Sequence, residues 1–168
     1  SVAKILNSMF ALGLSEEEIA VRVKRLGADC PFFAYNRPMA ARGIGDLLEP
    51  VDVDLRGYTM IVVKPDVSVP TAAAYAGVTL RVPETDVEKL VAKPVGQWKG
   101  LLVNDFEESI FPKHPELSAI KQSLYDAGAV YVSMSGSGSA IFGLFEDDNL
   151  SDIFAAKCAQ PLLYKMKL

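Results

Sequence analysis

The sequence predicts an α+β protein whose larger part follows a split βαβ plan. A strand rich in β-branched residues at 58–64 is followed, after several short helical segments, by two apolar strands at 129–134 and 140–145. A helix is expected at 151–158, and alternating residues at 162–168 predict a last strand with one solvated face. The order strand, helices, strand, strand, helix, strand is the ferredoxin-like plan, with extra helices inserted in the first crossover.

The first residues of the chain predict one face of a helix. Its apolar positions follow the i, i+3, i+4 spacing: Val2, Ile5, Leu6, Met9 and Phe10. No convincing capping sequence precedes them, and Gly13 can end the helix, because glycine adopts the left-handed conformation without steric cost. We therefore expect the chain to begin inside a helix of a longer protein, and a start at a true domain edge is the alternative.

A second helix is predicted from Ser15 to about Leu26. Ser15 and Glu18 have the spacing of a capping box, in which the serine hydroxyl accepts the N–H of the glutamate and the glutamate carboxylate reaches back. The first turn is acidic and the last turn is basic, which suits the helix dipole, and Gly27 ends the helix.

Two prolines bound the next predicted strands. Pro31 cannot continue a helix and favours extended geometry in the residue before it, so 32–35 and 39–42 are predicted as two short strands around a turn. Pro65 closes the strand at 58–64.

The pattern is weaker between this strand and residue 113. Short helices are predicted at 71–76, 86–92 and 105–111, and a clearer helix with an apolar face over 117–124 stops at Gly128. The residues before about Asp54 contain no sheet of adequate size, whereas the rest could form a core alone. We therefore place a domain boundary there, between 1–54 and 55–168.

Composition limits the classes of function. The 168 residues are half apolar, and 17 basic against 21 acidic side chains give a net charge of −4. A chain of this size can bury a core without disulfides or metal, and its apolar composition excludes extended disorder. No apolar run approaches the length of a membrane helix, and the absence of a basic block argues against nucleic-acid binding. Cys30, Cys158 and a single histidine form no zinc pattern, and so few cysteines are typical of a reducing, cytoplasmic compartment.

The first candidate site is Asp29, which lies between a helix-ending glycine and an apolar, proline-stiffened segment. A carboxylate held in this way can act as a general base or as a partner of a reacting hydroxyl. Capping of a turn by its own side chain is the alternative, and spacing alone favours the alternative.

The second candidate is the Gly/Ser run between the two apolar strands, Ser135, Gly136, Ser137, Gly138 and Ser139. Glycines allow successive amide groups to point into one concavity, which suits phosphate oxygens. A simple hairpin turn is the commoner explanation of such a run, and the run is neither a Walker nor a Rossmann sequence.

The third candidate joins ARGIGD at 41–46 with VSVPTAAAY at 67–75. Thr71 and Tyr75 have i, i+4 spacing, so a hydroxyl and an aromatic ring lie on one side of a short helix and could bind a polar, planar ligand. A helix cap at the threonine and a tyrosine in the core are the alternative.

Five motifs together resemble a known family. They are LGADCPFF at 26–33, ARGIGD at 41–46, VSVPTAAAY at 67–75, VNDFE at 103–107 and MSGSGS at 134–139. Each is weak alone, but in this order, over residues 1 to about 145, they resemble the GHMP kinases, and among them the branch that phosphorylates 4-diphosphocytidyl-2-C-methyl-D-erythritol.

This resemblance implies transfer of the γ-phosphoryl group of ATP, with Mg²⁺, to the 2-hydroxyl of that small molecule, in the non-mevalonate route to isoprenoid precursors. The catalytic aspartate of the family falls on Asp29, which reverses the preference for a capping role. The Ser135–Ser139 loop would lie beside the ATP phosphates and support them. Thr71 and Tyr75 would bind the substrate, with the Tyr75 ring stacked on the cytosine.

The resemblance also implies that residues 1–54 are the helical remnant of an N-terminal ribosomal-S5-like domain and that 55–168 are the C-terminal GHMP domain. The ATP phosphate loop would precede residue 1, so we expect the chain alone to be inactive. Its expected partners are the small-molecule substrate and either that N-terminal region or a second copy of the chain.

Two alternatives remain open. One is another GHMP kinase, of the homoserine or mevalonate type. The other is a ferredoxin-like binding module without chemistry, which would leave no exposed apolar face on residues 1–12.

Overall fold

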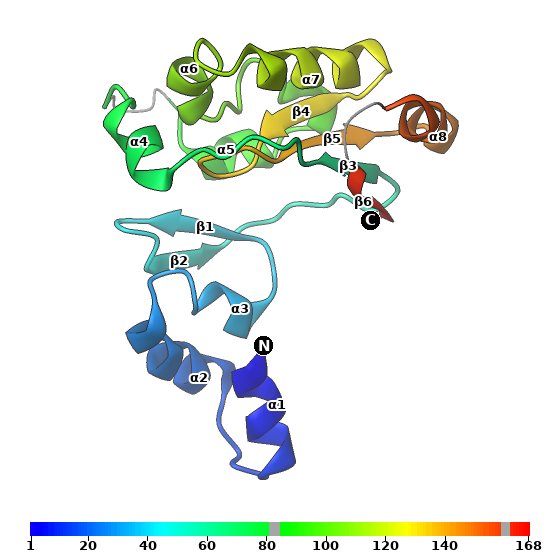
Figure 1. Ribbon diagram of the computed structural model, residues 1–168. Coiled ribbons are helices and arrows are strands. Elements are labelled where there is room, and N and C mark those ends of the chain that lie inside the picture. The colour runs from blue at the N-terminus through cyan, green and yellow to red at the C-terminus, as the bar shows by residue number, and fades with distance from the viewer. Residues whose placement is uncertain (81–84, 159–161) are drawn as a thin grey trace. The chain divides into compact units, whose positions relative to one another are not determined.

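A computed structural model describes residues 1–80, 85–158 and 162–168 and divides the chain into two compact units (Figure 1). They are Ser1–Val53 and Asp54–Leu168. Within the described ranges, no helix is both long and apolar enough to span a bilayer.

The N-terminal unit consists of short helices and a two-stranded sheet. Its elements are α1 (Val2–Met9), α2 (Glu16–Val23), the 3₁₀-helix η1 (Lys24–Leu26), α3 (Phe32–Tyr35), β1 (Met39–Arg42) and β2 (Leu47–Pro50). The predicted capping box is present at α2: the Glu18 N–H donates to Ser15 Oγ at 3.1 Å, and the Ser15 N–H donates to Glu18 Oε2 at 2.9 Å.

Two predictions in this unit need correction. Residues 32–35 form helix α3 and not a strand, because Pro31, with φ −57°, sits just before its first turn, where a missing N–H costs nothing. Asn36, in the left-handed conformation, ends this helix. The strand at 39–42 is confirmed, but its antiparallel partner β2 was not predicted. This unit is therefore not purely helical.

The core of the N-terminal unit is small. Ile19 and Ala20 of α2 pack with Ala34 of α3, and a few half-buried apolar side chains surround them. Asn7 of α1 both donates to and accepts from the backbone of Leu14 at 3.0 Å, which ties α1 to the segment before α2. No residue of α1 is buried, and its large apolar side chains are exposed: Val2, Ile5, Leu6 and Met9.

The C-terminal unit is built on a four-stranded antiparallel sheet in the order β4-β5-β3-β6. The strands are β3 (Thr59–Val63), β4 (Tyr131–Met134), β5 (Ile141–Phe145) and β6 (Leu162–Lys167). Sequence neighbours β4 and β5 form a hairpin, whereas β3 lies between β5 and β6. This order confirms the predicted ferredoxin-like plan.

Helices complete the C-terminal unit. They are α4 (Thr71–Ala76), α5 (Val87–Val91), η2 (Val95–Gln97), α6 (Phe106–Ile110), α7 (Pro115–Asp126) and α8 (Asp148–Lys157). The α7 helix runs along β4 and β5 (Figure 1) and buries Leu117, Ile120 and Leu124 against the sheet. Gly143 of β5 permits this approach, because a Cβ there would lie 3.3 Å from the Leu124 side chain.

Candidate functional site

Asp29 lies in the turn that connects η1 to α3. The Cys30 N–H donates to Gly27 O and the Phe32 N–H donates to Asp29 O, both at 3.2 Å, so the backbone on either side of Asp29 is held. Asp29 itself is exposed, and no side chain caps the first turn of α3. The turn therefore presents an accessible carboxylate on a fixed backbone.

The glycines of the 41–46 motif make room for carboxylates. Gly45, with φ +93°, faces Asp29: a Cβ at Gly45 would lie 3.0 Å from Asp29 Oδ1. The neighbouring Asp46 pairs with Lys24 of η1, whose Nζ lies 2.8 Å from Asp46 Oδ2. The hydrogen bond from Lys24 holds the pKa of the Asp46 carboxyl below its usual value. This ion pair anchors the β1–β2 turn beside the turn that carries Asp29.

The Ser135–Ser139 run forms the β4–β5 hairpin loop. The Ser135 N–H donates to Ala140 O at 2.8 Å and the Gly138 N–H donates to Ser135 O at 3.0 Å, so these two amides are used inside the hairpin. Gly136 and Gly138 both have positive φ, +54° and +93°. The loop is thus a defined turn, and a phosphate could use only its other amides and its hydroxyls.

Lys64 fixes the end of this loop, a role that the sequence did not indicate. Its Nζ donates to Ser139 Oγ at 2.8 Å and to the carbonyls of Pro65 and Val67 at 3.1 Å. The Ser139 hydroxyl donates in turn to Val67 O. The ammonium group thus has one acceptor for each of its three protons, and Lys64 connects the loop to the segment after β3.

The structure brings the second candidate site together with the 67–75 segment of the third, whereas residues 41–46 belong to the other compact unit. Thr71 Oγ1 lies 3.3 Å from Ser137 Oγ, which is hydrogen-bonding distance. Tyr75 is 67% exposed, and its ring meets Phe106 edge to face with centroids 5.0 Å apart. The alternative of a core tyrosine is therefore wrong, and α4 begins without a side-chain cap. The Tyr75 ring is accessible and contacts Phe106 along one edge.

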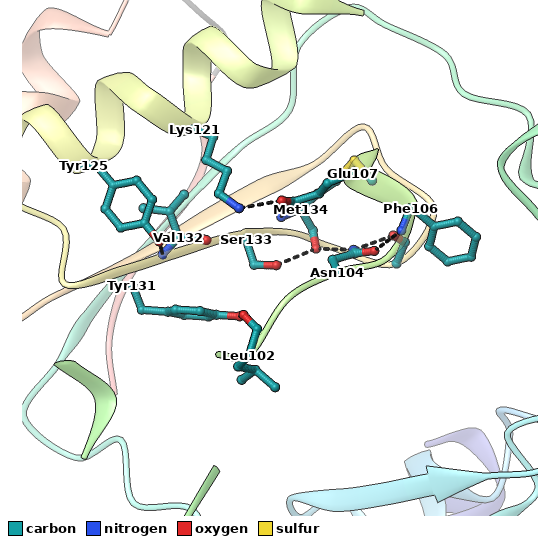
Figure 2. A network of polar contacts seen from close by, with 11 residues as sticks. Leu102, Asn104, Phe106, Glu107, Lys121, Tyr125, Tyr131, Val132, Ser133 and Met134 are labelled. Atoms are coloured by element: carbon teal, nitrogen blue, oxygen red, sulfur yellow. Dashed lines mark hydrogen bonds and ion pairs between the residues drawn. The ribbon is translucent and has the colours of Figure 1, made fainter. Parts of the chain in front are cut away.

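A polar network connects the VNDFE motif to β4 (Figure 2). The Asn104 side chain donates to Met134 O at 2.7 Å, and Glu107 Oε1 accepts the Met134 N–H at 2.8 Å. In the same region the Tyr131 hydroxyl donates to Leu102 O at 3.1 Å, and burial raises the pKa of Tyr131 to about 12. In the sequence, VNDFE contributes only to the family resemblance. The i, i+3 spacing of the polar side chains of Asn104 and Glu107 is the signal that could have indicated this role.

The residue types that commonly bind metal ions do not cluster among the described residues of either unit. Across residues 1–80, 85–158 and 162–168, the structure contains no group of three or more His, Cys, Asp or Glu residues that could hold a metal ion. No metal site formed by protein side chains alone is therefore assigned within the described residues.

Comparison with known families gives a match for the C-terminal unit. Residues 87–162 match the family described as "GHMP kinases C terminal". The chain carries a GHMP kinase C-terminal domain.

Curated relatives of this chain include several kinases of one name. The chain is 46% identical over 145 residues to a 4-diphosphocytidyl-2-C-methyl-D-erythritol kinase of Bacteroides thetaiotaomicron, covering 86% of the chain and 53% of the relative. A protein of the same name from Parabacteroides distasonis is 48% identical over 143 residues, covering 85% of the chain and 53% of the relative. The chain thus spans about half the length of the curated relatives it matches.

Solved structures agree with the GHMP assignment. A crystal structure of 4-(cytidine 5'-diphospho)-2C-methyl-D-erythritol kinase is similar with a TM-score of 0.75 and 31% identity, over 92% of this chain and 57% of that one. A homoserine kinase from Cytophaga hutchinsonii is similar with a TM-score of 0.66 over 97% of this chain and 61% of that one. At 16% identity, the second likeness shows the fold alone.

Proposed function

We propose that the protein containing this chain transfers the γ-phosphoryl group of ATP to the 2-hydroxyl of 4-diphosphocytidyl-2-C-methyl-D-erythritol. The observation that carries this proposal is the 46–48% identity to relatives that bear this one name, across 85–86% of the chain. Homoserine and mevalonate kinases are weaker candidates, because their solved structures share only 16–18% identity with the chain.

Asp29 is the proposed catalytic residue. Its exposed carboxylate stands on a turn with two backbone hydrogen bonds, and Gly45 leaves space beside its Oδ1. It would accept or orient the proton of the substrate hydroxyl while that oxygen attacks phosphorus in line. Phosphoryl transfer of this kind needs mainly positioning and charge stabilisation, and an oriented carboxylate supplies the proton acceptor.

The Ser135–Ser139 loop is the proposed support of the ATP phosphates. Its backbone is fixed by two hydrogen bonds within the hairpin, and Lys64 ties its last residue to the segment after β3. A preorganised loop binds an anion better than a mobile one, because less conformational entropy is lost on binding.

Thr71 and Tyr75 are the proposed substrate-binding residues. The contact between Thr71 and Ser137 supports a shared site for the substrate and the phosphate-supporting loop. The exposed ring of Tyr75, braced by Phe106, is suited to stack on a pyrimidine base.

Mg²⁺ is part of the proposal because ATP transfers its terminal phosphoryl group as a metal complex. In proteins, Mg²⁺ commonly keeps several waters and is bound by substrate phosphates with one or two carboxylates, so no dedicated cluster of acidic residues is required. We also propose that residues 1–54 belong to the N-terminal domain of such a kinase and that the protein is cytoplasmic.

An ADP-release assay tests the proposal. The complete gene product is incubated with ATP, Mg²⁺ and, separately, the cytidyl alcohol, homoserine or mevalonate. We expect ADP release with the cytidyl alcohol alone. ADP release with homoserine or mevalonate, and not with the cytidyl alcohol, would indicate a GHMP kinase of another specificity. No ADP release with any of the three alcohols would favour the alternative of a ferredoxin-like binding module.

A further inference from the structure

Strand β4 is an edge strand, and its outward-facing backbone groups need partners. In the order β4-β5-β3-β6, β5 is the only strand among the described residues that pairs with β4, so alternate residues of β4 turn their N–H and C=O away from the sheet. At Val132 the hydroxyl of Tyr125 satisfies both groups: it accepts the N–H at 3.2 Å and lies 3.3 Å from the carbonyl oxygen. A side chain therefore replaces the missing strand at this position.

Met134 is the next outward-facing residue, and it is also where the strand ends and the loop begins. Glu107 Oε1 accepts its N–H at 2.8 Å, and Asn104 Nδ2 donates to its carbonyl at 2.7 Å (Figure 2). The same Nδ2 donates to Gly136 O at 2.8 Å, inside the loop. Asn104 and Glu107 thus hold three backbone atoms at the start of the loop.

Both side chains are themselves held in place. Asn104 Oδ1 accepts the Phe106 N–H at 3.0 Å, which fixes the amide at the start of α6. Glu107 Oε2 pairs with Lys121 Nζ of α7 at 2.5 Å, and the Glu107 side chain is only 12% exposed. Hydrogen bonds to an ionised acceptor are stronger than neutral ones, particularly where water is largely excluded. The restraint on Met134 is therefore stiff.

The restraint continues into the loop through the Met134 side chain. Met134 is buried, and its Sδ would lie 2.8 Å from a Cβ at Gly138, so this side chain packs directly under the second glycine. Fixing Met134 therefore fixes the surface on which Gly138 rests.

We propose that Asn104 and Glu107 are positioning residues that hold the Ser135–Ser139 loop in the conformation that supports the ATP phosphates. This inference rests on the function proposed above for the loop. The alternative is a purely structural role, in which these residues only protect the sheet edge. Tyr125 is the matched comparison, because it hydrogen-bonds the same edge at Val132, two residues before Met134.

The test compares variants of the complete gene product. Asn104→Ala removes the two bonds to Met134 O and Gly136 O and the bond from the Phe106 N–H, and Glu107→Ala removes the bond from the Met134 N–H and the pair with Lys121. Loss of even one such bond typically corresponds to about a tenfold change in an equilibrium constant. We expect the KM for ATP to rise about tenfold and the KM for the cytidyl alcohol to stay within about twofold. Amide hydrogens of residues 134–139 should exchange about tenfold faster.

Two further variants separate positioning from stability. Glu107→Gln retains an oxygen that can accept the Met134 N–H, so its KM for ATP should return to within about threefold of the wild-type value. Tyr125→Phe should speed exchange at Val132 and lower stability while leaving the KM for ATP unchanged.

The inference is overturned by any of three results: wild-type exchange at 134–139 in both alanine variants, an equal rise in both KM values, or the same rise in the KM for ATP in Tyr125→Phe. If the wild-type protein phosphorylates none of the alcohols, the proposed function fails separately. In that case faster exchange of the loop in the alanine variants still supports its restraint by these residues, and unchanged exchange overturns it.

Discussion

Gly138 is the position where the hairpin loop tolerates a side chain least. Its φ of +93° lies in the region that L-residues avoid, and a Cβ would lie 2.8 Å from the sulfur of Met134, a side chain that is 2% exposed. Met134 is held by Asn104 and Glu107 through its backbone, so it has little freedom to move away. Gly138→Ala should therefore be penalised by backbone strain and by overpacking together.

Gly136 provides a matched control within the same loop. It also has positive φ, +54°, but nothing lies within 4 Å of a Cβ built on it. Gly136→Ala should cost only the left-handed backbone penalty, about 1–2 kcal/mol. Gly138→Ala adds an overpacking penalty of about 1–3 kcal/mol and should cost about 2–5 kcal/mol in total.

Urea unfolding of both variants measures the difference. Trp98, the single tryptophan of the sequence, is buried and meets Tyr131 edge to face at 5.4 Å, so its fluorescence follows the unit that contains the loop. We expect Gly138→Ala to lower the free energy of unfolding by at least about 1 kcal/mol more than Gly136→Ala does. Equal destabilisation by the two substitutions would refute the reasoning from the Met134 contact.

Two further predictions concern aromatic side chains. Tyr75→Ala should raise the KM for the cytidyl alcohol about tenfold with little change in kcat, because stacking on the base is lost, whereas Tyr75→Phe should keep the wild-type KM. Steady-state kinetics measures both variants, and an unchanged KM in the alanine variant would count against stacking. Burial raises the pKa of Tyr131 to about 12, so its neutral phenol stabilises the fold below about pH 10, and this contribution is lost as the pH rises through about 12. Tyr131→Phe should lower the amplitude of tyrosine ionisation near pH 12 in an ultraviolet titration, and an unchanged amplitude there would contradict the assignment.

The strands and helices of the C-terminal unit could be predicted because their sequence patterns agree with their burial. In β3, Thr59, Ile61 and Val63 alternate as buried residues, as the run of β-branched residues indicated. The helix expected at 71–76 has the same bounds in the structure. Local pattern and tertiary packing favour the same structure here.

The N-terminal unit was less predictable because its short elements carry weak patterns. Pro31 is compatible with both a strand boundary and the first turn of a helix, and the aromatic residues after it favour strands by propensity, although they form α3. Strand β2 is mostly exposed and shows no clear alternation of apolar and polar residues, so only its pairing with β1 reveals it.

The candidate sites, too, could be predicted from the sequence only in part. Asp29 and the Gly/Ser loop could be proposed from sequence because special backbone positions flank them. Sequence alone could not show the contact of Thr71 with Ser137, nor the bonds from Lys64 and Asn104 to the loop. These contacts join residues more than 30 positions apart, and only the folded sheet brings them together.

The most direct test of the proposed function is the turnover number of the complete gene product in which Asp29 is replaced by asparagine. With ATP, Mg²⁺ and the cytidyl alcohol, loss of a general base should lower kcat by a factor of about 10²–10⁴ and leave the KM values nearly unchanged. Asp52→Asn, at an exposed aspartate of the same unit, is the control and should retain wild-type turnover. Wild-type kcat in the Asp29→Asn variant would remove Asp29 from the mechanism and contradict the account.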